Sequence, residues 1–301
     1  MRCIESDDAP LEFSEKGGGV PVILLHSTGS SGAQWRALAS ELSERHRVIV
    51  PNLYGYGRTP IWRGRGRFTL AREVDLLVPL LEHAGEPAHI VGHSYGGAVA
   101  LHMARARPRS IRSLTMIEPA TFHLLLDGSA ADQRAYARIR SVACEVWRSL
   151  ATGDYENGAR TFVDYWSGAG SWRAMPPRQQ LLTMQRMPKI GLDFHATLHD
   201  AARAGDFGAL AAPMLLMRSE STTTVAVRVA ARLGAMFPQA CRHRLSEGGH
   251  MAPVSHPREV NAAIHAQLRT WDSGYADCLR QVAGGMPNSR RNARLNAVSV
   301  S

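Results

Sequence analysis

The chain has 301 residues, of which 45% are hydrophobic and 20% charged, and this ordinary globular composition excludes disordered, collagen-like and coiled-coil chains. The length allows one or two domains with a large core. Thirty-five basic and 26 acidic residues leave a net charge of +9. The basic residues are scattered, and their densest run is Arg290, Arg291 and Arg294. We therefore interpret the charge as solvated surface and predict no nucleic-acid partner.

The cysteines and the N-terminus indicate a compartment. Cys3, Cys144, Cys241 and Cys278 form no CxxC-type metal or redox motif, and sparse cysteines are typical of reducing compartments. The first ten residues carry acids where a signal peptide needs basic and then apolar residues. No apolar run approaches the roughly 18 residues of a membrane span. We expect a cytoplasmic protein without a membrane partner, and we leave its oligomeric state open.

Strand and helix patterns alternate through the first part of the chain. In chain order they are a strand at 20–27, a helix at 35–43, a strand at 47–53, a helix at 69–85, a strand at 88–94, a helix at 95–108 and a strand at 111–119. The strands are short and almost continuously apolar, as expected when both faces of a sheet are covered. The alternation therefore predicts an α/β fold with a mostly parallel sheet.

The pattern breaks in the middle of the chain and then returns. Residues 120–207 contain helix-like stretches, such as 132–150, and no convincing strand. After them come a strand at 212–219, a helix at 224–237, a weak strand at 240–245 and a last helix from His256 to Trp271. We therefore predict a core made of residues 1–119 and 208–271, and a helical cap at 120–207. We expect the basic tail, 272–301, to be disordered.

A serine lies in a sharp turn at the end of a strand. Ligands bind at the carboxyl ends of parallel strands, and Gly92-His93-Ser94-Tyr95-Gly96 joins the strand at 88–94 to a helix. This is the context of a G-x-S-x-G nucleophile elbow, which lifts a serine hydroxyl above the sheet. The alternative is a glycine turn with a bystander serine. We predict that Ser94 is the nucleophile.

Two further strand ends complete a candidate site. A tetrahedral oxyanion needs fixed N–H donors, and we predict those of Tyr95 and of Thr28, which follows the strand at 20–27. A plain Ser/Gly turn is the alternative for the Thr28 loop. His250 follows a glycine pair at the last strand-to-helix turn and is the predicted general base. His93 should point away from the serine, and the remaining histidines are expected at the surface or in the cap.

These three motifs, in this order on alternating strands and helices, resemble the α/β-hydrolase superfamily over residues 11–270. The resemblance implies an eight-stranded sheet, a helical cap inserted after the sixth strand and a Ser–acid–His triad. Two departures stand out. Ser27 replaces the glycine that usually follows the first histidine, which predicts a stiffer loop, and Asn52 replaces a usual aspartate.

The triad acid is not where the family usually has it. After the seventh strand, the position that resembles the usual aspartate is Thr222, which cannot stabilise an imidazolium by charge. We predict that Glu118 replaces it, because Glu118 ends a buried strand and needs a partner there. Pro119 should hold it extended. Some haloalkane dehalogenases have their acid after this strand, but they lack a serine at the elbow. Glu220, or a Ser–His dyad without an acid, is the alternative.

The predicted activity is hydrolysis of a small-to-medium apolar carboxylic ester through an acyl-enzyme, with no metal or organic cofactor. The cap residues that either line an apolar pocket or pack the cap are Phe122, Trp147, Phe162, Tyr165, Trp166, Trp172, Met175, Met184 and Met187.

Three alternative functions remain open. The first is C–C bond hydrolysis of a ring-cleavage product, whose carboxylate needs polar or arginine contacts. The cap arginines that could provide them are Arg134, Arg138, Arg140, Arg148, Arg160 and Arg173. The second is acyl transfer or perhydrolysis on the same site, and the third is a ligand-binding receptor with little turnover.

Overall fold

The computed structural model describes residues 1–6 and 9–283, with side chains described up to residue 274. Eight strands form one sheet in the order β1-β2-β4-β3-β5-β6-β7-β8. Their bounds are β1 Arg2–Glu5, β2 Pro10–Lys16, β3 Pro21–Leu25, β4 Arg47–Pro51, β5 Ala88–His93, β6 Ile111–Ile117, β7 Met214–Ser219 and β8 Cys241–Leu245. β2 pairs antiparallel with β1 and β4, and the other neighbours are parallel. The mostly parallel sheet is confirmed.

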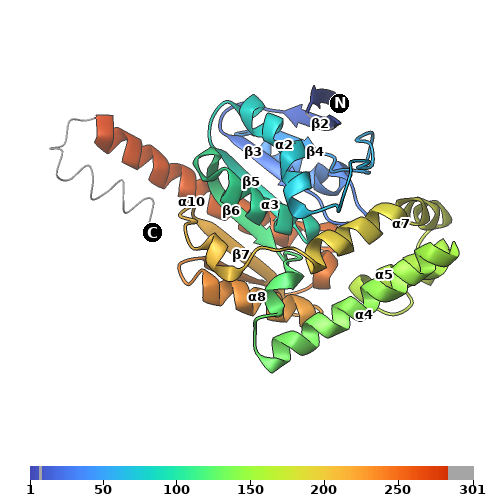
Figure 1. Cartoon of the computed structure of the whole chain (residues 1–301). Coiled ribbons are helices and arrows are strands. Elements are labelled where there is room, and N and C mark those ends of the chain that lie inside the picture. The colour runs from blue at the N-terminus through green and yellow to red at the C-terminus, as the bar shows by residue number, and fades with distance from the viewer. Residues whose placement is uncertain (7–8, 284–301) are drawn as a thin grey trace.

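Helices cover both faces of the sheet (Figure 1). The core helices are α1 Arg36–Leu42, α2 Leu70–Ala84, α3 Tyr95–Ala106, α8 Thr224–Met236, α9 Ala252–Ser255 and α10 Pro257–Ala283, with 3-10 turns η1 Gly32–Trp35, η2 Pro108–Ser110, η3 Phe122–Leu125, η4 Ala204–Phe207 and η5 Gly249–Met251. Along β3, Val22 and Leu24 pack with α1 and α10, while Ile23 and Leu25 pack with α2 and α3. This alternation divides the core into one layer on each face.

Helices α4 Ala130–Thr152, α5 Tyr155–Ser167, α6 Ser171–Ala174 and α7 Pro177–Leu198 lie between β6 and β7 in the chain, and we call them the inserted helices. Residues 120–207 contain no strand, as predicted. In α4, the side chain of Ser129 caps the first turn, and left-handed Gly153 ends the helix. Figure 1 shows the inserted helices on the side of the molecule opposite the far end of α10.

The C-terminal boundary differs from the prediction. The last helix was expected to end near Trp271, with a disordered tail from 272, but α10 continues to Ala283. Asp272 explains the start of this extension, because its carboxylate lies 2.9 Å from His46 Nε2 and 3.0 Å from His89 Nε2. Residues 284–301 of the predicted tail lie outside the described residues.

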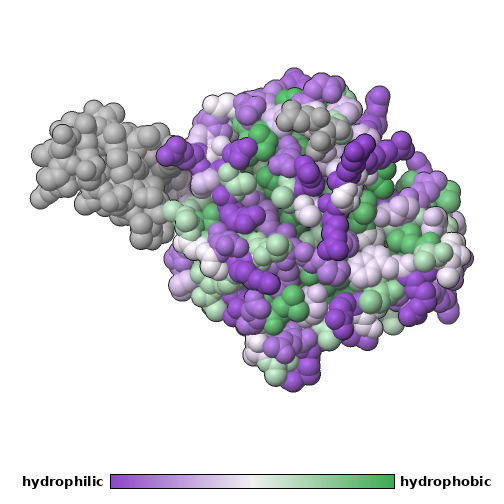
Figure 2. All heavy atoms as spheres, in the orientation of Figure 1, coloured by the Kyte–Doolittle hydropathy of each residue, from purple (hydrophilic) through white to green (hydrophobic). Residues whose placement is uncertain are grey.

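The surface is dominated by polar residues. The face shown in Figure 2 is mostly hydrophilic, and its hydrophobic residues form small separate groups. Among the described helices, none combines the length and apolar character needed to cross a membrane.

Candidate active site

The loop between β5 and α3 is a strained turn that presents Ser94. Ser94 has φ of +54°, and apart from Glu118 it is the only non-glycine residue with positive φ among those described. The flanking glycines allow close packing. A Cβ on Gly92 would lie 2.3 Å from the Gly96 carbonyl oxygen, and one on Gly96 would lie 2.3 Å from that of Leu25. Backbone strain of this kind concentrates at functional sites.

Ser94, His250 and Glu118 form a continuous chain of contacts. Ser94 Oγ lies 3.0 Å from His250 Nε2, and His250 Nδ1 lies 2.8 Å from Glu118 Oε2. The three residues come from the ends of β5 and β6 and from η5, and all are buried, at 6%, 4% and 2% exposure for Ser94, His250 and Glu118. The indole of Trp166, from α5, stacks on the His250 ring with centroids 4.0 Å apart.

Glu118 is held as a carboxylate by three donors. The Ser219 N–H donates to Oε1 at 2.8 Å, and the Thr222 hydroxyl donates to Oε2 at 2.6 Å, beside His250. Burial acts to raise the pKa of Glu118, but the hydrogen bonds from His250, Thr222 and Ser219 outweigh it and lower that pKa. Thr222, at the usual position of the acid, therefore supports a carboxylate that comes from β6.

The backbone of Glu118 differs from the expectation, and the alternative acid, Glu220, does not face the site. Glu118 was expected to be extended but has φ of +44°. The Glu118 N–H donates to the Met217 carbonyl oxygen, and the Ala120 N–H donates to the Ser94 carbonyl oxygen. The chain therefore turns sharply as it leaves β6. Glu220, the alternative acid, is exposed and lies 3.4 Å from Arg244, so it does not face His250.

His93 and His26 are buried beside the site and serve its framework. His93 Nε2 lies 2.8 Å from the His250 carbonyl oxygen, so its ring points away from Ser94 as predicted. The Leu53 N–H donates to His26 Nε2 at 3.1 Å. Burial lowers the pKa of each ring to about 3. The expectation that the other histidines are surface or cap residues was wrong for three of them, which are buried in the core, namely His46, His89 and His102.

In the loop after β3, the N–H groups on either side of Thr28 have hydrogen-bond partners within the described residues. The Ser27 N–H donates to Gln34, the Gly29 N–H to Tyr56 and the Ser30 N–H to the Ser27 carbonyl. Thr28 lines the same cavity as Ser94. The Ser27 hydroxyl also donates to Gln34, at 2.9 Å, and the stiffer loop expected from Ser27 stays a prediction.

A buried charged cluster beneath this loop was missed by sequence reasoning. Lys189 of α7 is 1% exposed and pairs with Glu73, at 3.1 Å, and with Asp193. Tyr56 donates to Asp193, and the Tyr95 hydroxyl donates to Glu73. Burial raises the pKa of Asp193 to about 6. Through these contacts the cluster connects α7 to the Thr28 loop and to Tyr95, which are the two segments with a predicted oxyanion donor. One signal was available, since Lys189 and Asp193 are four residues apart and therefore lie on the same side of a helix.

Asn52 has a local explanation. Its amide donates to the Glu12 carboxylate at 2.7 Å and accepts the Gly32 N–H at 2.8 Å. An aspartate at this position would face Glu12 with a second carboxylate. Asparagine at this position therefore avoids placing two carboxylates side by side, because it donates to Glu12 instead.

A cavity of about 360 Å³ opens onto Ser94 and His250, within the range of small-molecule sites. Of the nine apolar residues proposed for its lining, Phe122, Phe162, Trp166 and Met175 contribute to it. The others do not; Met187, for example, is fully buried. The six cap arginines also do not line it, whereas Arg186, which was not predicted, does.

Comparison with known proteins agrees with this architecture. The family described as having an alpha/beta hydrolase fold matches residues 20–257. The chain is 30% identical to the lipase LipV of Mycobacterium tuberculosis, over 83% of this chain and 94% of that protein. It is 26% identical to the pimeloyl-[acyl-carrier protein] methyl ester esterase of Methylococcus capsulatus, over 85% of this chain and 97% of that protein. A thermophilic esterase structure from Thermogutta terrifontis superposes with a TM-score of 0.70 at 22% identity, covering 90% and 99% of the two chains.

Proposed function

This chain belongs to the α/β-hydrolase family and is an ester-hydrolysing enzyme, and we propose that Ser94, His250 and Glu118 are its catalytic triad. The observation that carries the proposal is the unbroken chain of contacts, 3.0 Å from Ser94 to His250 and 2.8 Å from His250 to Glu118. These are hydrogen-bond distances for nucleophile to base and for base to orienting acid.

The proposed reaction has two steps. His250 Nε2 takes the proton of Ser94, and Ser94 Oγ attacks the ester carbonyl carbon. The N–H groups of Tyr95 and Thr28 stabilise the negative charge on the carbonyl oxygen. The alcohol leaves with the proton from His250, and an acyl-enzyme remains. Water then gives a proton to His250 and attacks the acyl carbon, and His250 returns that proton to Ser94 Oγ as the bond from Oγ to the acyl carbon breaks and the acid is released.

Glu118 has a defined part in both steps. Its carboxylate accepts from His250 Nδ1, which keeps the tautomer whose Nε2 is free to accept the serine proton. Its negative charge stabilises the imidazolium that forms. Ser219 and Thr222 hold the carboxylate ionised and in place without titrating themselves.

The proposed substrate is a small-molecule ester with a small-to-medium apolar acyl group. The cavity wall beside Ser94 contains Phe162, Trp166, Met175 and Phe194, and aromatic and methionine side chains favour apolar ligands of variable shape. We propose that the inserted helices, which provide these residues, act as a cap over the core. The cytoplasmic location stays a prediction from the sparse cysteines.

Turnover of p-nitrophenyl esters from acetate to octanoate tests this proposal. We expect hydrolysis with a maximum of kcat/KM at a short or medium chain, and loss of turnover in Ser94→Ala. Glu118→Gln then tests the acid separately. A folded protein that cleaves none of these esters, or a Ser94→Ala variant with normal turnover, would contradict the proposal.

Arg186 keeps one alternative open. Its side chain lines the cavity, and its guanidinium donates to the Gly29 carbonyl at 2.8 Å. A cation in the pocket suits a substrate with a carboxylate, as in C–C bond hydrolysis of a ring-cleavage product. Turnover of a vinylogous diketo acid with esters untouched, abolished in Arg186→Gln, would favour that activity over ester hydrolysis.

A further inference from the structure

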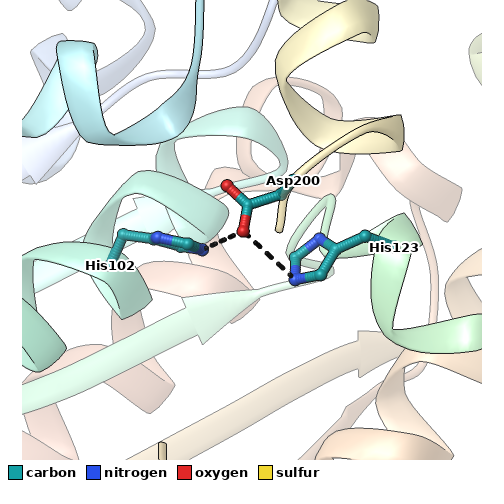
Figure 3. A group of neighbouring side chains, drawn as sticks. All are labelled: His102, His123 and Asp200. Carbon is teal, nitrogen blue, oxygen red and sulfur yellow. Dashed lines mark ion pairs between the residues drawn. The ribbon is translucent and has the colours of Figure 1, made fainter. Parts of the chain in front are cut away.

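Two histidines and an aspartate, none of them part of the proposed triad, lie close together (Figure 3). His102 is on α3, about two helical turns after Ser94. His123 is in η3, just before the inserted helices, and Asp200 follows α7, just after them. In Figure 3 both imidazole rings point toward the Asp200 carboxylate. Three segments that are distant in sequence therefore converge on one point.

The two rings are buried without the hydrogen bonds that burial normally requires. His102 and His123 are 2% and 1% exposed, neither ring nitrogen of His102 has a hydrogen-bond partner within the described part of the chain, and the Thr197 main chain is the one group that bonds the His123 ring there. Buried polar atoms in this condition are costly and need an explanation. Two buried rings that face one carboxylate, one of them without any partner, point to a group that bonds them together.

The spacing suits a shared metal ion better than direct contact. Asp200 Oδ1 lies 3.7 Å from His102 Nε2 and 3.9 Å from His123 Nε2, which is beyond hydrogen-bond length. One ligand atom from each residue lies within 4.8 Å of both others. Tetrahedral zinc with bonds of about 2.0–2.1 Å separates its ligand atoms by roughly 3.3–3.5 Å. The two distances to Asp200 exceed this spacing by about 0.2–0.6 Å, so the ring nitrogens must move inward when an ion binds.

A main-chain donor and two arginines also act on this group. The Ala202 N–H donates to Asp200 Oδ1 at 2.8 Å and fixes the carboxylate. Arg105 and Arg203 face the group from outside and weaken the attraction for a cation.

We propose that His102, His123 and Asp200 bind one divalent transition-metal ion, Zn²⁺ in the first instance. Two imidazoles and a carboxylate are donors that zinc accepts, and a water or the second carboxylate oxygen completes four-coordination. The ion joins the helix that begins at the nucleophile to both ends of the inserted helices. Its role is structural, and it fixes how the inserted helices sit on the core. This site is independent of the proposed ester hydrolysis.

The sequence contains no motif for this site, because its ligands come from three separate segments. The prediction that ester hydrolysis needs no metal is unaffected, because the proposed ion takes no part in the reaction. A metal that fixes the inserted helices contributes to stability and pocket shape without entering the reaction.

Zinc titration of the full chain tests the proposal. The purified protein is treated with a chelator, dialysed and titrated with ZnCl₂ by isothermal titration calorimetry. We expect one ion per chain, a higher Tm with zinc, and at least about a 100-fold loss of affinity in Asp200→Asn. That variant is isosteric and keeps an acceptor for the Ala202 N–H. His102→Gln is the second variant, and far-UV circular dichroism checks that each is folded.

A matched control separates this site from surface histidines. His195 and His199 lie on α7 and just after it, with ring centroids 4.8 Å apart, so they are an alternative zinc-binding pair. His199→Asn should leave affinity and the rise in Tm unchanged. Co²⁺ should give the visible absorption of a four-coordinate site in wild type and not in Asp200→Asn. No stoichiometric binding, binding that survives in Asp200→Asn, or binding lost in His199→Asn would overturn the proposal.

Discussion

Replacing Glu118 by glutamine changes one charge at the centre of the proposed triad and almost no volume. In the native site Oε1 accepts from the Ser219 N–H, while Oε2 accepts from Thr222 and faces His250 Nδ1 at 2.8 Å. If the amide oxygen of the new glutamine side chain keeps the Ser219 bond, its NH₂ faces His250. The proton of His250 must then move to Nε2, where it faces Ser94 and blocks proton transfer.

The opposite amide orientation is also unfavourable. It places the NH₂ against the Ser219 N–H, so that two donors meet in a buried site. Neither orientation supplies the negative charge that stabilises the imidazolium. We therefore expect kcat to fall by roughly 10³–10⁴-fold, equivalent to about 4–5.5 kcal/mol of transition-state stabilisation. KM should change little, since Glu118 does not line the cavity.

The assay is p-nitrophenyl ester hydrolysis under saturating substrate, with circular dichroism to show that the variant is folded. Glu220→Gln is the matched control, because it makes the same chemical change at the exposed alternative acid, and its kcat should stay within about twofold of wild type, as for most exposed substitutions. A near-normal kcat in Glu118→Gln, or a comparable loss in Glu220→Gln, would refute the reasoning.

Three other predictions concern the contacts around the site. Thr222→Val removes a buried hydrogen bond to the Glu118 carboxylate and should lower kcat roughly tenfold, and unchanged steady-state kinetics would argue against its supporting role. Lys189→Met leaves two buried carboxylates without their cation and should reduce the free energy of unfolding by about 3–5 kcal/mol, as measured by urea denaturation; a variant as stable as wild type would contradict this. The pKa of His26 is lowered to about 3 by burial, whereas an unfolded histidine takes up a proton below about pH 6.5. The unfolded state therefore binds more protons between these values, and stability should fall as the pH decreases through this window. His26→Asn should make the free energy of unfolding fall less steeply as the pH decreases, whereas the exposed His256→Asn should leave this pH dependence unchanged. The same pH dependence in wild type and both variants would refute the assignment.

Much of the fold was predictable because apolar runs and turn residues mark the parallel strands and their helices. β1 and β2 were not read from the pattern, since β1 is exposed and β2 is partly polar, and they entered only through the family resemblance. The end of α10 was missed because Asp272 is anchored by His46 and His89, contacts that exist only in the folded chain.

The candidate site likewise contains residues that local sequence motifs predict and contacts that exist only in the folded chain. Ser94 and His250 lie in local motifs, so their turns could be identified from neighbouring residues. Glu118 was accessible through the cost of a carboxylate at the end of a buried strand. The left-handed backbone of Glu118, the support from Thr222 and the Lys189 cluster depend on contacts between distant segments, and no local pattern encodes them.

Labelling with a fluorophosphonate probe, followed by mass-spectrometric location of the adduct, tests the central claim most directly. The probe reacts with a serine only when a base has activated it and an oxyanion site accommodates its phosphoryl oxygen. We expect one covalent adduct, on Ser94, that is absent in Ser94→Ala and strongly slowed in Glu118→Gln. A folded protein with no adduct, or with its adduct on another serine, would contradict the proposed triad.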